Sequence, residues 1–367
     1  MPYLILFLLL ALGGCCTAPK KPLPAEPKIA SWSELPGWKE GNALPAWQSF
    51  RKSCNVLEKQ ASWNSVCIAA ESLQDPDISA ARIFFEQHFN PYALSNPDGS
   101  KEGLITGYFE PVIRGSKKPS SRYRYPVYGV PNDLISVDLG EIYPELKHMR
   151  LRGRLEGRKV VPYYSRSQIG GSSVPLKGNE ILWTDDAMEL FFLQIQGSGK
   201  VEMDDGETVR IGYADQNGYP YESIGRILVM RGEIPLERAS MEGIKDWARS
   251  HPEKLEELLD ENPSYVFFRF LPDTLSGPPG ALGIPLTPGR SIAVDSRIIP
   301  LGSPVYLSTT WPESAKPLNR LVLAQDTGGA IKGAVRADVY WGSGRDAGAL
   351  AGKTRQRGRL WILLPKP

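Results

Sequence analysis

The stretch LVLAQDTGGAIKG at residues 321–333 decides the fold, because it places Asp326 between a buried-looking strand and a glycine turn. Two further aspartates stand in similar contexts, Asp295 in AVDSRIIPLG and Asp338 in RADVYWG. A carboxylate beside apolar strands costs free energy if it is buried without a partner. Such groups are usually hydrogen-bonded in a turn, or keep a raised pKa and handle protons. Since the chain has only 3 His, a general acid is expected among these aspartates.

Four more motifs precede the aspartate cluster in a fixed order: GYFEP at 107–111, QIQGSG at 194–199, NGYPYESIG at 217–225 and NPSYVFF at 262–268. Together with the cluster, they resemble the membrane-bound lytic murein transglycosylase A family, whose three-aspartate module is the 3D domain. The resemblance runs from about Trp47 to the C-terminus.

This resemblance implies a mainly β fold with some α, in which a second β-domain is inserted into a double-psi β-barrel and a groove lies between the two. The expected division is a lipoprotein signal peptide at 1–15, a Pro-rich tether at 16–45, the barrel from 46–105 plus 265–367, and an inserted substrate-binding domain at 106–264.

Hydrophobic periodicity gives the local structure. Apolar residues recur at helical spacing from 46 to about 94, and short strands separated by turns follow from 104 to about 212. Within that region, residues 187–192 favour a short helix. Amphipathic helices are expected at 221–231 and 240–250, and strands again dominate after 265.

Length and charge restrict the class of protein. With 367 residues, the chain can form two domains and a sizeable core. The formal net charge is +2. No strong nucleic-acid footprint is therefore indicated.

The first residues favour a secreted lipoprotein. The apolar run at 4–12 is too short to span a bilayer and fits a signal-peptide core. LGGC at 12–15 has the small residues that precede an acylated cysteine, so Cys15 is the expected lipid-modified N-terminus. A plain signal peptide cut nearby is the alternative. The residue after Cys15 is not Asp, which favours the periplasm-facing side of the outer membrane.

Cys54 and Cys67 are an even pair, which in an oxidising periplasm predicts a disulfide. Two buried free thiols are the alternative. No His stands at a metal-ligand spacing from either cysteine, so we expect no metal, and no phosphate-loop pattern or cofactor motif occurs.

The resemblance assigns the acid role to Asp338, which matches the family's catalytic aspartate. Asp326 matches the second one, and is either part of the catalytic site or a turn residue that holds backbone amides. Asp295 is expected to be a structural carboxylate paired with Arg297. Because a close cation would lower the pKa of an acid, any pairing of Lys332 or Arg336 is expected to involve Asp326 rather than Asp338.

Sugars bind to aromatic faces and to polar groups that satisfy hydroxyls. We expect residues 194–199 to form a strand with both glutamines on one side, and its glycines to admit a ligand; an ordinary strand-to-turn transition is the alternative. The expected substrate-binding residues are Thr106, Tyr108, Gln194, Gln196, Gly197, Ser198, Gly199, Tyr213, Asn217, Tyr221 and Lys332.

The activity that the resemblance implies is cleavage of peptidoglycan glycan strands, at the β-1,4 bond between N-acetylmuramic acid and N-acetylglucosamine, with formation of a 1,6-anhydro end. Two alternatives remain at this stage. One is a hydrolase that uses Asp338 and Asp326 with water, and the other is a non-catalytic wall-binding lipoprotein.

Overall fold

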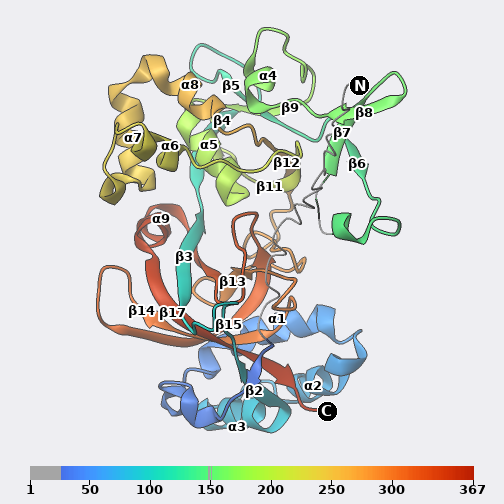
Figure 1. Cartoon of the computed structure of the whole chain (residues 1–367), viewed down its shortest axis with the longest axis vertical. Helices are drawn as coiled ribbons and strands as arrows, with labels where there is room; N and C mark the ends of the chain where they lie inside the picture. The colour runs from blue at the N-terminus through green and yellow to red at the C-terminus, as the bar shows by residue number, and fades with distance from the viewer. Residues whose placement is uncertain (1–25, 148, 150) are drawn as a thin grey trace, which may run out of the picture.

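The computed structural model describes residues 26–147, 149 and 151–367, and the expected signal peptide with Cys15 lies outside them. The described chain forms two lobes (Figure 1). The lower lobe in this view contains both the blue N-terminal helices and the red C-terminal strands, whereas the upper lobe is made of the green and yellow middle of the chain. The middle segment is therefore inserted into a domain that the two ends of the chain build together.

A ring of six strands closes in the lower lobe. Its order is β17, β14, β15, β13, β16 and β3, and β17 pairs with β3 to complete the circle. These strands are β3 (Gly103–Glu110), β13 (Ser291–Val294), β14 (Pro304–Thr310), β15 (Pro317–Thr327), β16 (Ala337–Ser343) and β17 (Arg355–Pro365). The pairs β13–β15 and β16–β3 are parallel and the others antiparallel. This closed ring is the barrel that the sequence led us to expect.

Alternate residues of the barrel strands face two different cores, as the period of two in a strand requires. Val322 and Ala324 of β15 pack in the barrel interior with Ile105 and Val339. Leu321 and Leu323 of the same strand pack outward against the N-terminal helices. Because both faces of β15 are buried, its sequence is a nearly continuous apolar run.

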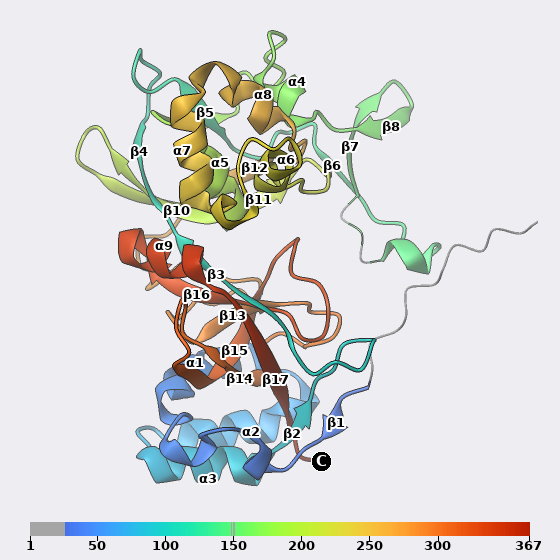
Figure 2. The ribbon, with the colours of Figure 1, turned by 60° about the vertical axis from the view of Figure 1, so that its left-hand side comes forward.

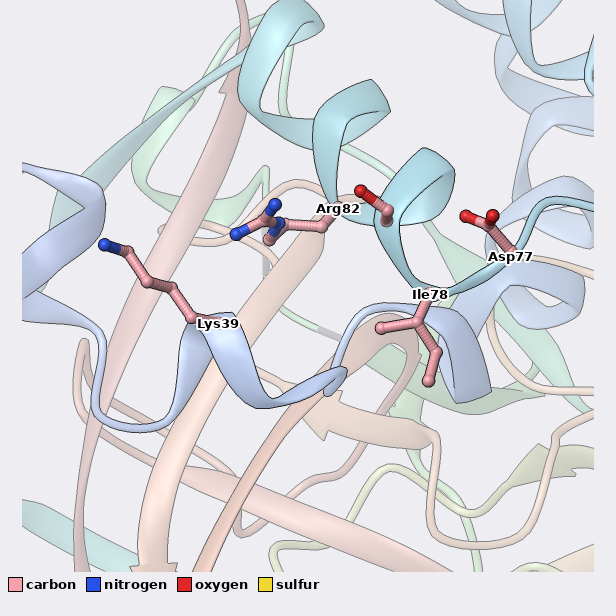
Figure 3. Close-up of a pocket in the computed structure, with 5 residues that line it drawn as sticks. Lys39, Asp77, Ile78 and Arg82 are labelled. Atoms are coloured by element: carbon pink, nitrogen blue, oxygen red, sulfur yellow. The ribbon is translucent and has the colours of Figure 1, made fainter.

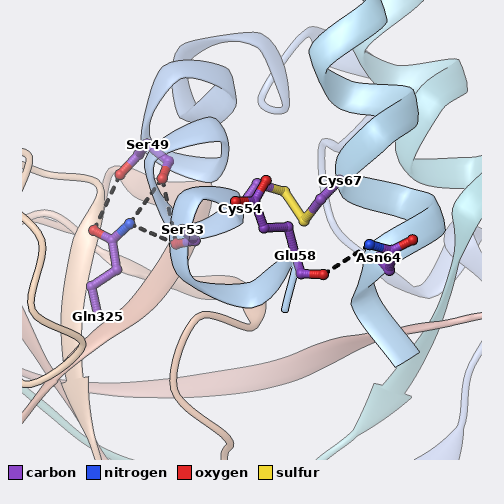
Figure 4. Close-up of a disulfide and its surroundings, with 7 residues drawn as sticks. All are labelled: Ser49, Ser53, Cys54, Glu58, Asn64, Cys67 and Gln325. Carbon is purple, nitrogen blue, oxygen red and sulfur yellow. Dashed lines mark hydrogen bonds between the residues drawn. A yellow bond between two sulfur atoms is a disulfide. The ribbon is translucent and has the colours of Figure 1, made fainter. Parts of the chain in front are cut away.

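The N-terminal helices cover this outer face of the barrel. They are α1 (Trp47–Leu57), α2 (Ala61–Ser72) and α3 (Ile78–His88), which confirms the expected helices as far as His88. The expectation is wrong for the five residues that follow, which form a strand. Asp77 caps α3 by accepting a hydrogen bond from the Ala80 amide at 2.7 Å. A disulfide joins Cys54 of α1 to Cys67 of α2, with the two Cα atoms 5.2 Å apart (Figure 4). Two further strands, β1 (Lys28–Ile29) and β2 (Phe89–Ala93), extend the sheet beyond β17.

The expected tether at 16–45 is too long. Leu35 and Trp38 are each only 2 % exposed. The Trp38 ring contacts Phe85 and Tyr306 edge-on, and its indole N–H donates to Glu86 at 2.9 Å. Apolar burial of this size holds the segment on the barrel lobe despite its prolines.

The upper lobe is a six-stranded sheet in the order β12, β11, β10, β4, β9, β5, with helices packed on it. Its strands are β4 (Val112–Ser116), β5 (Tyr125–Tyr128), β9 (Glu180–Thr184), β10 (Ser198–Met203), β11 (Thr208–Gln216) and β12 (Val266–Leu271). Its helices are α4 (Arg166–Gly170), α5 (Ala187–Gln196), α6 (Ile224–Met230), α7 (Met241–Ser250) and α8 (Leu255–Asp260), and α9 (Gly344–Lys353) packs on β3 in the barrel lobe. Short 3-10 turns occur at Trp32–Glu34, Trp38–Glu40, Leu44–Ala46, Pro144–Leu146, Leu236–Arg238 and Pro252–Lys254.

Strand pairing moves both expected domain boundaries. β3 stays in the barrel sheet as far as Glu110, and the chain enters the upper lobe only with β4. On the return, β12 pairs with β11, so residues 266–271 belong to the upper sheet and not to the barrel. Apolar strand patterns look alike in both sheets, so the sequence did not distinguish which partner each strand takes.

A separate three-stranded sheet projects from the upper lobe and is called the arm below (Figure 2). It consists of β6 (Ile135–Val137), β7 (Leu151–Glu156) and β8 (Lys159–Pro162), paired in the order β6, β7, β8.

Helix α1 is tied to the barrel through the fully buried side chain of Gln325 (Figure 4). Its Nε2 donates to the Ser49 carbonyl and to Ser53 Oγ, both at 2.9 Å. Its Oε1 accepts from Ser49 Oγ at 3.3 Å and from Ser291 Oγ. The register of β13 against β15 shifts here, so Gln325 is the extra residue of a β-bulge next to Asp326.

We predict that Gln325→Ala lowers the free energy of unfolding by roughly 1–3 kcal/mol, because it strands buried hydroxyl and carbonyl groups. Urea denaturation measures this loss. The control is Gln87→Ala on the exposed face of α3, which is expected to stay within about 0.5 kcal/mol of the parent. Equal stability of both variants would show that the network does not hold α1 to the barrel.

Candidate active site

Two strands of the barrel bring the first pair of site residues together. β16 runs parallel to β3, and the register places Asp338 opposite Thr106. Thr106 Oγ1 donates a hydrogen bond of 2.6 Å to Asp338 Oδ1. Tyr108 lies two residues further along β3 and therefore on the same face as Thr106.

The environment of Asp338 favours its protonated form. Burial raises the pKa of this carboxyl to about 6, and the nearby charge of Asp326 acts in the same direction. The Thr106 hydrogen bond and the Arg336 charge oppose that rise only in part. We expected any flanking cation to pair with Asp326 rather than Asp338. This is wrong for Arg336, whose charge lowers the pKa of Asp338. Its guanidinium donates to the carbonyls of Leu104 and Ala337, which anchors it beside Asp338.

Asp326 is held by three donors at the end of β15. Tyr108 Oη donates to its Oδ2 at 2.7 Å. The backbone amides of Ala281 and Thr327 donate to its Oδ1 at 3.0 and 2.9 Å. Burial still raises the pKa of this carboxyl above its ordinary value, against the effect of these hydrogen bonds. Asp326 therefore holds backbone amides, and it also lies close enough to Asp338 to influence its charge.

Asp295 serves a different purpose. Arg297 donates to both of its oxygens, at 2.8 and 2.6 Å, and the Gly333 amide donates to Oδ2 at 3.0 Å. Burial alone would raise the pKa of Asp295, but these hydrogen bonds lower it to about 2. The structural interpretation of Asp295 agrees with this geometry, in which the carboxylate fastens the loop between β15 and β16.

The expected strand at 194–199 is wrong. Gln194 and Gln196 lie in the last turn of α5, Gly197 ends the helix with φ of 79°, and β10 begins only at Ser198. Side chains two positions apart on a helix point in different directions. Gln194 is accordingly buried beside Tyr265, while Gln196 Oε1 accepts from the Phe109 amide at 3.0 Å.

The backbone conformation accounts for one glycine of this motif, and close packing accounts for the other. Gly197 adopts the left-handed conformation that a helix C-cap needs. A Cβ on Gly199 would come within 2.4 Å of Leu193 and 3.1 Å of the Pro111 carbonyl. The alternation of polar and apolar residues in QIQGSG imitated a strand, because a helix end followed by a glycine cap gives the same short pattern.

Asn217 is also misassigned as a sugar contact. It is 1 % exposed. Its amide donates to the carbonyls of Tyr164 and Pro263 at 2.9 and 2.8 Å, and its Oδ1 accepts from the amides of Tyr265 and Tyr219. With both donors and the acceptor engaged, the side chain stabilises a loop junction.

The other expected binding residues keep exposed surface. Tyr213 on β11 and Tyr221 before α6 are 37 % and 42 % exposed, Lys332 is exposed in the loop before β16, and Ser198 is half-buried at the start of β10. A surface cavity lined by Lys39, Asp77, Ile78, Ser79 and Arg82 lies among the N-terminal helices (Figure 3) and contains none of the site residues.

Sequence reasoning missed the residues that join the lobes at the site. Glu110 ends β3 with no exposed surface, and Arg210 of β11 forms an ion pair with it at 2.7 Å. Ser343 of β16 donates to the other Glu110 oxygen. The acidic residue inside the otherwise apolar GYFEP motif was the available signal, since a buried carboxylate needs a partner. Among the described residues, no group of three or more His, Cys, Asp or Glu could hold a metal ion.

Comparison with known proteins agrees with this arrangement. The family model described as "MltA specific insert domain" matches residues 104–269, and the model described as "3D domain" matches residues 290–364. The membrane-bound lytic murein transglycosylase A of Vibrio cholerae is 36 % identical over 276 residues, which cover 72 % of this chain and 67 % of that protein.

The chain belongs to the membrane-bound lytic murein transglycosylase A family. Solved structures of the family support this. The crystal structure of MltA from Neisseria gonorrhoeae, in its monoclinic form, matches with a TM-score of 0.79 at 40 % identity, and covers 92 % of each chain. MltA of Escherichia coli with bound chitohexaose matches with a TM-score of 0.68 at 26 % identity, and covers 94 % of each chain.

We predict opposite stability changes for two aspartates of this transglycosylase A site. The pKa of Asp338 is raised, so its charge opposes folding once the pH exceeds about 4. Asp338→Asn is therefore expected to raise Tm at pH 7, and the gain should vanish near pH 4. The pKa of Asp295 is lowered, so its stabilising effect is present at pH 7 and is lost as the pH falls toward 2.

Asp295→Asn is accordingly expected to lower Tm at pH 7. Thermal melts of both variants and the parent between pH 4 and 7 test the pair. A Tm loss at pH 7 for Asp338→Asn would contradict the account of its burial.

Proposed function

We propose that this lytic transglycosylase uses Asp338 as its single acid and base, and cleaves the β-1,4 bond between N-acetylmuramic acid and N-acetylglucosamine. Family membership makes the chain a peptidoglycan lytic transglycosylase, which is a lyase. The observation that carries the proposal for Asp338 is its pKa of about 6 beside the Thr106 hydrogen bond. A general acid works best with a pKa near the working pH.

The proposed reaction uses one carboxyl twice. Protonated Asp338 donates its proton to the glycosidic oxygen as the bond from that oxygen to the anomeric carbon breaks, with an oxocarbenium-like transition state. The C6 hydroxyl of the same muramic acid then attacks the anomeric carbon. The Asp338 carboxylate takes the hydroxyl proton and returns to its starting form, so no water is consumed and the product carries a 1,6-anhydro ring.

Neighbouring groups support this cycle. Thr106 orients the carboxyl through Oδ1, which leaves Oδ2 to exchange the proton with substrate. Asp326 raises the pKa of Asp338 by its charge. Asp326 itself is occupied by Tyr108 and two amides, so it is poorly placed to activate a water as the second carboxylate of a hydrolase would.

The glycan is proposed to lie across Asp338 and to contact residues of both the barrel lobe and the upper lobe. A sugar polymer, chitohexaose, is bound by the Escherichia coli relative, which supports glycan binding by this chain. The candidates that remain for substrate contact are Thr106, Tyr108, Ser198, Tyr213, Tyr221 and Lys332. Gln194, Gln196, Gly197, Gly199 and Asn217 are proposed to shape the lobe instead.

The chain is proposed to be anchored to the outer membrane, facing the periplasm, by a lipid on Cys15. The relatives are named as membrane-bound proteins. In the described part of the chain, no helix has the length and apolar character needed to cross a bilayer. A lipid-modified cysteine ahead of a short linker supplies membrane attachment of another kind.

We predict that purified protein without residues 1–16 releases anhydro-muropeptides from peptidoglycan, each one water lighter by mass than a reducing-end product. Asp338→Asn is expected to lose turnover by roughly 10²–10⁴-fold or more, since an amide cannot donate the proton. It should still bind insoluble peptidoglycan. Product release and sedimentation with peptidoglycan measure the two properties.

Two variants complete this test. Asp204→Asn, in the exposed hairpin turn between β10 and β11, should keep full turnover. Asp326→Asn should lose some turnover together with site geometry. Reducing-end products from the parent would support the hydrolase alternative, and a folded but inactive Asp326→Asn beside an active Asp338→Asn would transfer the acid role to Asp326.

A further inference from the structure

The arm presents one uniformly apolar face. Leu155 of β7 lies directly opposite Val160 of β8, and the register places every second residue of the three strands beside them. This face consists of Ile135, Val137, Leu151, Gly153, Leu155, Val160 and Pro162. Leu155 and Val160 are 61 % and 53 % exposed. A sheet with one face in solvent ordinarily places its polar residues on that face. The arm has the opposite arrangement, with apolar residues on its solvent-exposed face.

The polar face of the arm is the one that packs on the upper lobe. Arg152 donates from Nε to both oxygens of Asp215 on β11, at 2.9 and 3.1 Å. The Arg154 guanidinium lies 4.3 Å from the ring centroid of Tyr164. Gly218 comes so close to Arg152 that a Cβ there would lie 2.9 Å from the arginine Cβ. These contacts fix the orientation of the arm, so its apolar face is held away from the lobe.

Exposed residues around this face are typical of a membrane interface. The turn between β7 and β8 carries Arg158 and Lys159, both exposed, while the neighbouring Glu156 is paired with Arg154 at 2.5 Å. In the loop that follows β6, Ile142 and Tyr143 are 72 % and 50 % exposed. Basic side chains and tyrosine beside apolar groups suit the headgroup region of a bilayer. The other acidic side chains between β6 and β8, Asp138, Glu141 and Glu145, lie in that loop, so Glu156 with its arginine partner is the one acidic residue of the hairpin.

The arm also lies on the side of the molecule where the chain leaves the barrel lobe. Figure 2 shows β1 and the arm at the same edge, one on each lobe. Glu26 lies eleven positions after Cys15, which allows at most about 40 Å of extended chain between them. A lipid on Cys15 would therefore keep the β1 edge close to the bilayer, and Ile29 on β1 is itself well exposed.

We propose that the apolar face of the arm docks on the lipid surface, and that it forms a second, reversible membrane contact beside the lipid on Cys15. The inference rests on the proposed anchor. A single acyl attachment leaves a protein free to tumble, whereas a second contact on the other lobe fixes its orientation. The protein would then lie with this edge on the membrane and its catalytic face toward the wall.

An environment-sensitive dye on the arm tests the proposal. The dye is attached to a cysteine introduced by Val160→Cys in the full chain. Cys16→Ser removes the other reactive thiol, since Cys54 and Cys67 are joined in the disulfide and Cys15 is expected to be acylated. The mass of the mature protein first establishes whether Cys15 carries lipid. Reconstitution into phosphatidylethanolamine and phosphatidylglycerol vesicles is expected to shift the dye emission to the blue. The control dye on Met230→Cys, 73 % exposed on α6, should not shift.

Leu155→Asp removes part of the apolar face without touching the catalytic residues. In the non-acylated protein it is expected to raise the lipid concentration for half-maximal shift by roughly tenfold, since a buried leucine contributes about that factor or more. Its turnover on soluble glycan should be unchanged. Absence of a vesicle-dependent shift at residue 160 would overturn the lipid contact. A shift without vesicles that grows with protein concentration would assign the face to a second copy of the chain.

If Cys15 proves to be unmodified, the proposed lipid anchor is refuted but the proposed contact of the arm is not. Vesicle titration of the non-acylated protein still tests whether the arm binds lipid.

Discussion

The hydrogen bond from Thr106 to Asp338 depends on the closure of the barrel, and the mechanism we propose depends on that hydrogen bond. β3 precedes the inserted lobe in the chain and β16 follows it, so Thr106 and Asp338 are 232 positions apart in the sequence. Their parallel pairing, together with the β17–β3 pairing, closes the ring and sets Asp338 opposite Thr106. An insertion between the two strands is tolerated because loop-closure entropy grows slowly with length.

Three aspartates that look alike in the sequence are separated by their partners. Asp295 meets a guanidinium and amides and remains charged to a pH of about 2. Asp326 meets a phenol and amides, and Asp338 meets one hydroxyl in a site where burial outweighs every compensating contact. Differences in solvation and hydrogen bonding thus let the same side chain fasten a loop at Asp295, supply a local charge at Asp326, and serve as the proposed acid at Asp338.

The sequence predicted the features that depend on short patterns. The aspartate motifs identified the family, the helical periodicity located α1 to α3, and the Asp295–Arg297 pair is near in sequence. It failed where partners are distant. The membership of β12 in the upper sheet, the engagement of Asn217 and the Glu110–Arg210 ion pair depend on contacts that periodicity does not encode. The error at 194–199 arose because a glycine-capped helix end alternates like a strand over six residues.

The pKa of Asp338 in the folded enzyme is the most direct test of the central claim. Carbon-13 spectra of aspartate-labelled protein, compared between the parent and Asp338→Asn, assign the Asp338 carboxyl carbon and follow it through a pH titration. The account predicts a midpoint of about 6, with the alkaline limb of kcat/KM falling over the same pH range. A midpoint near 4, or an alkaline limb that does not follow the titration of this carboxyl, would contradict it.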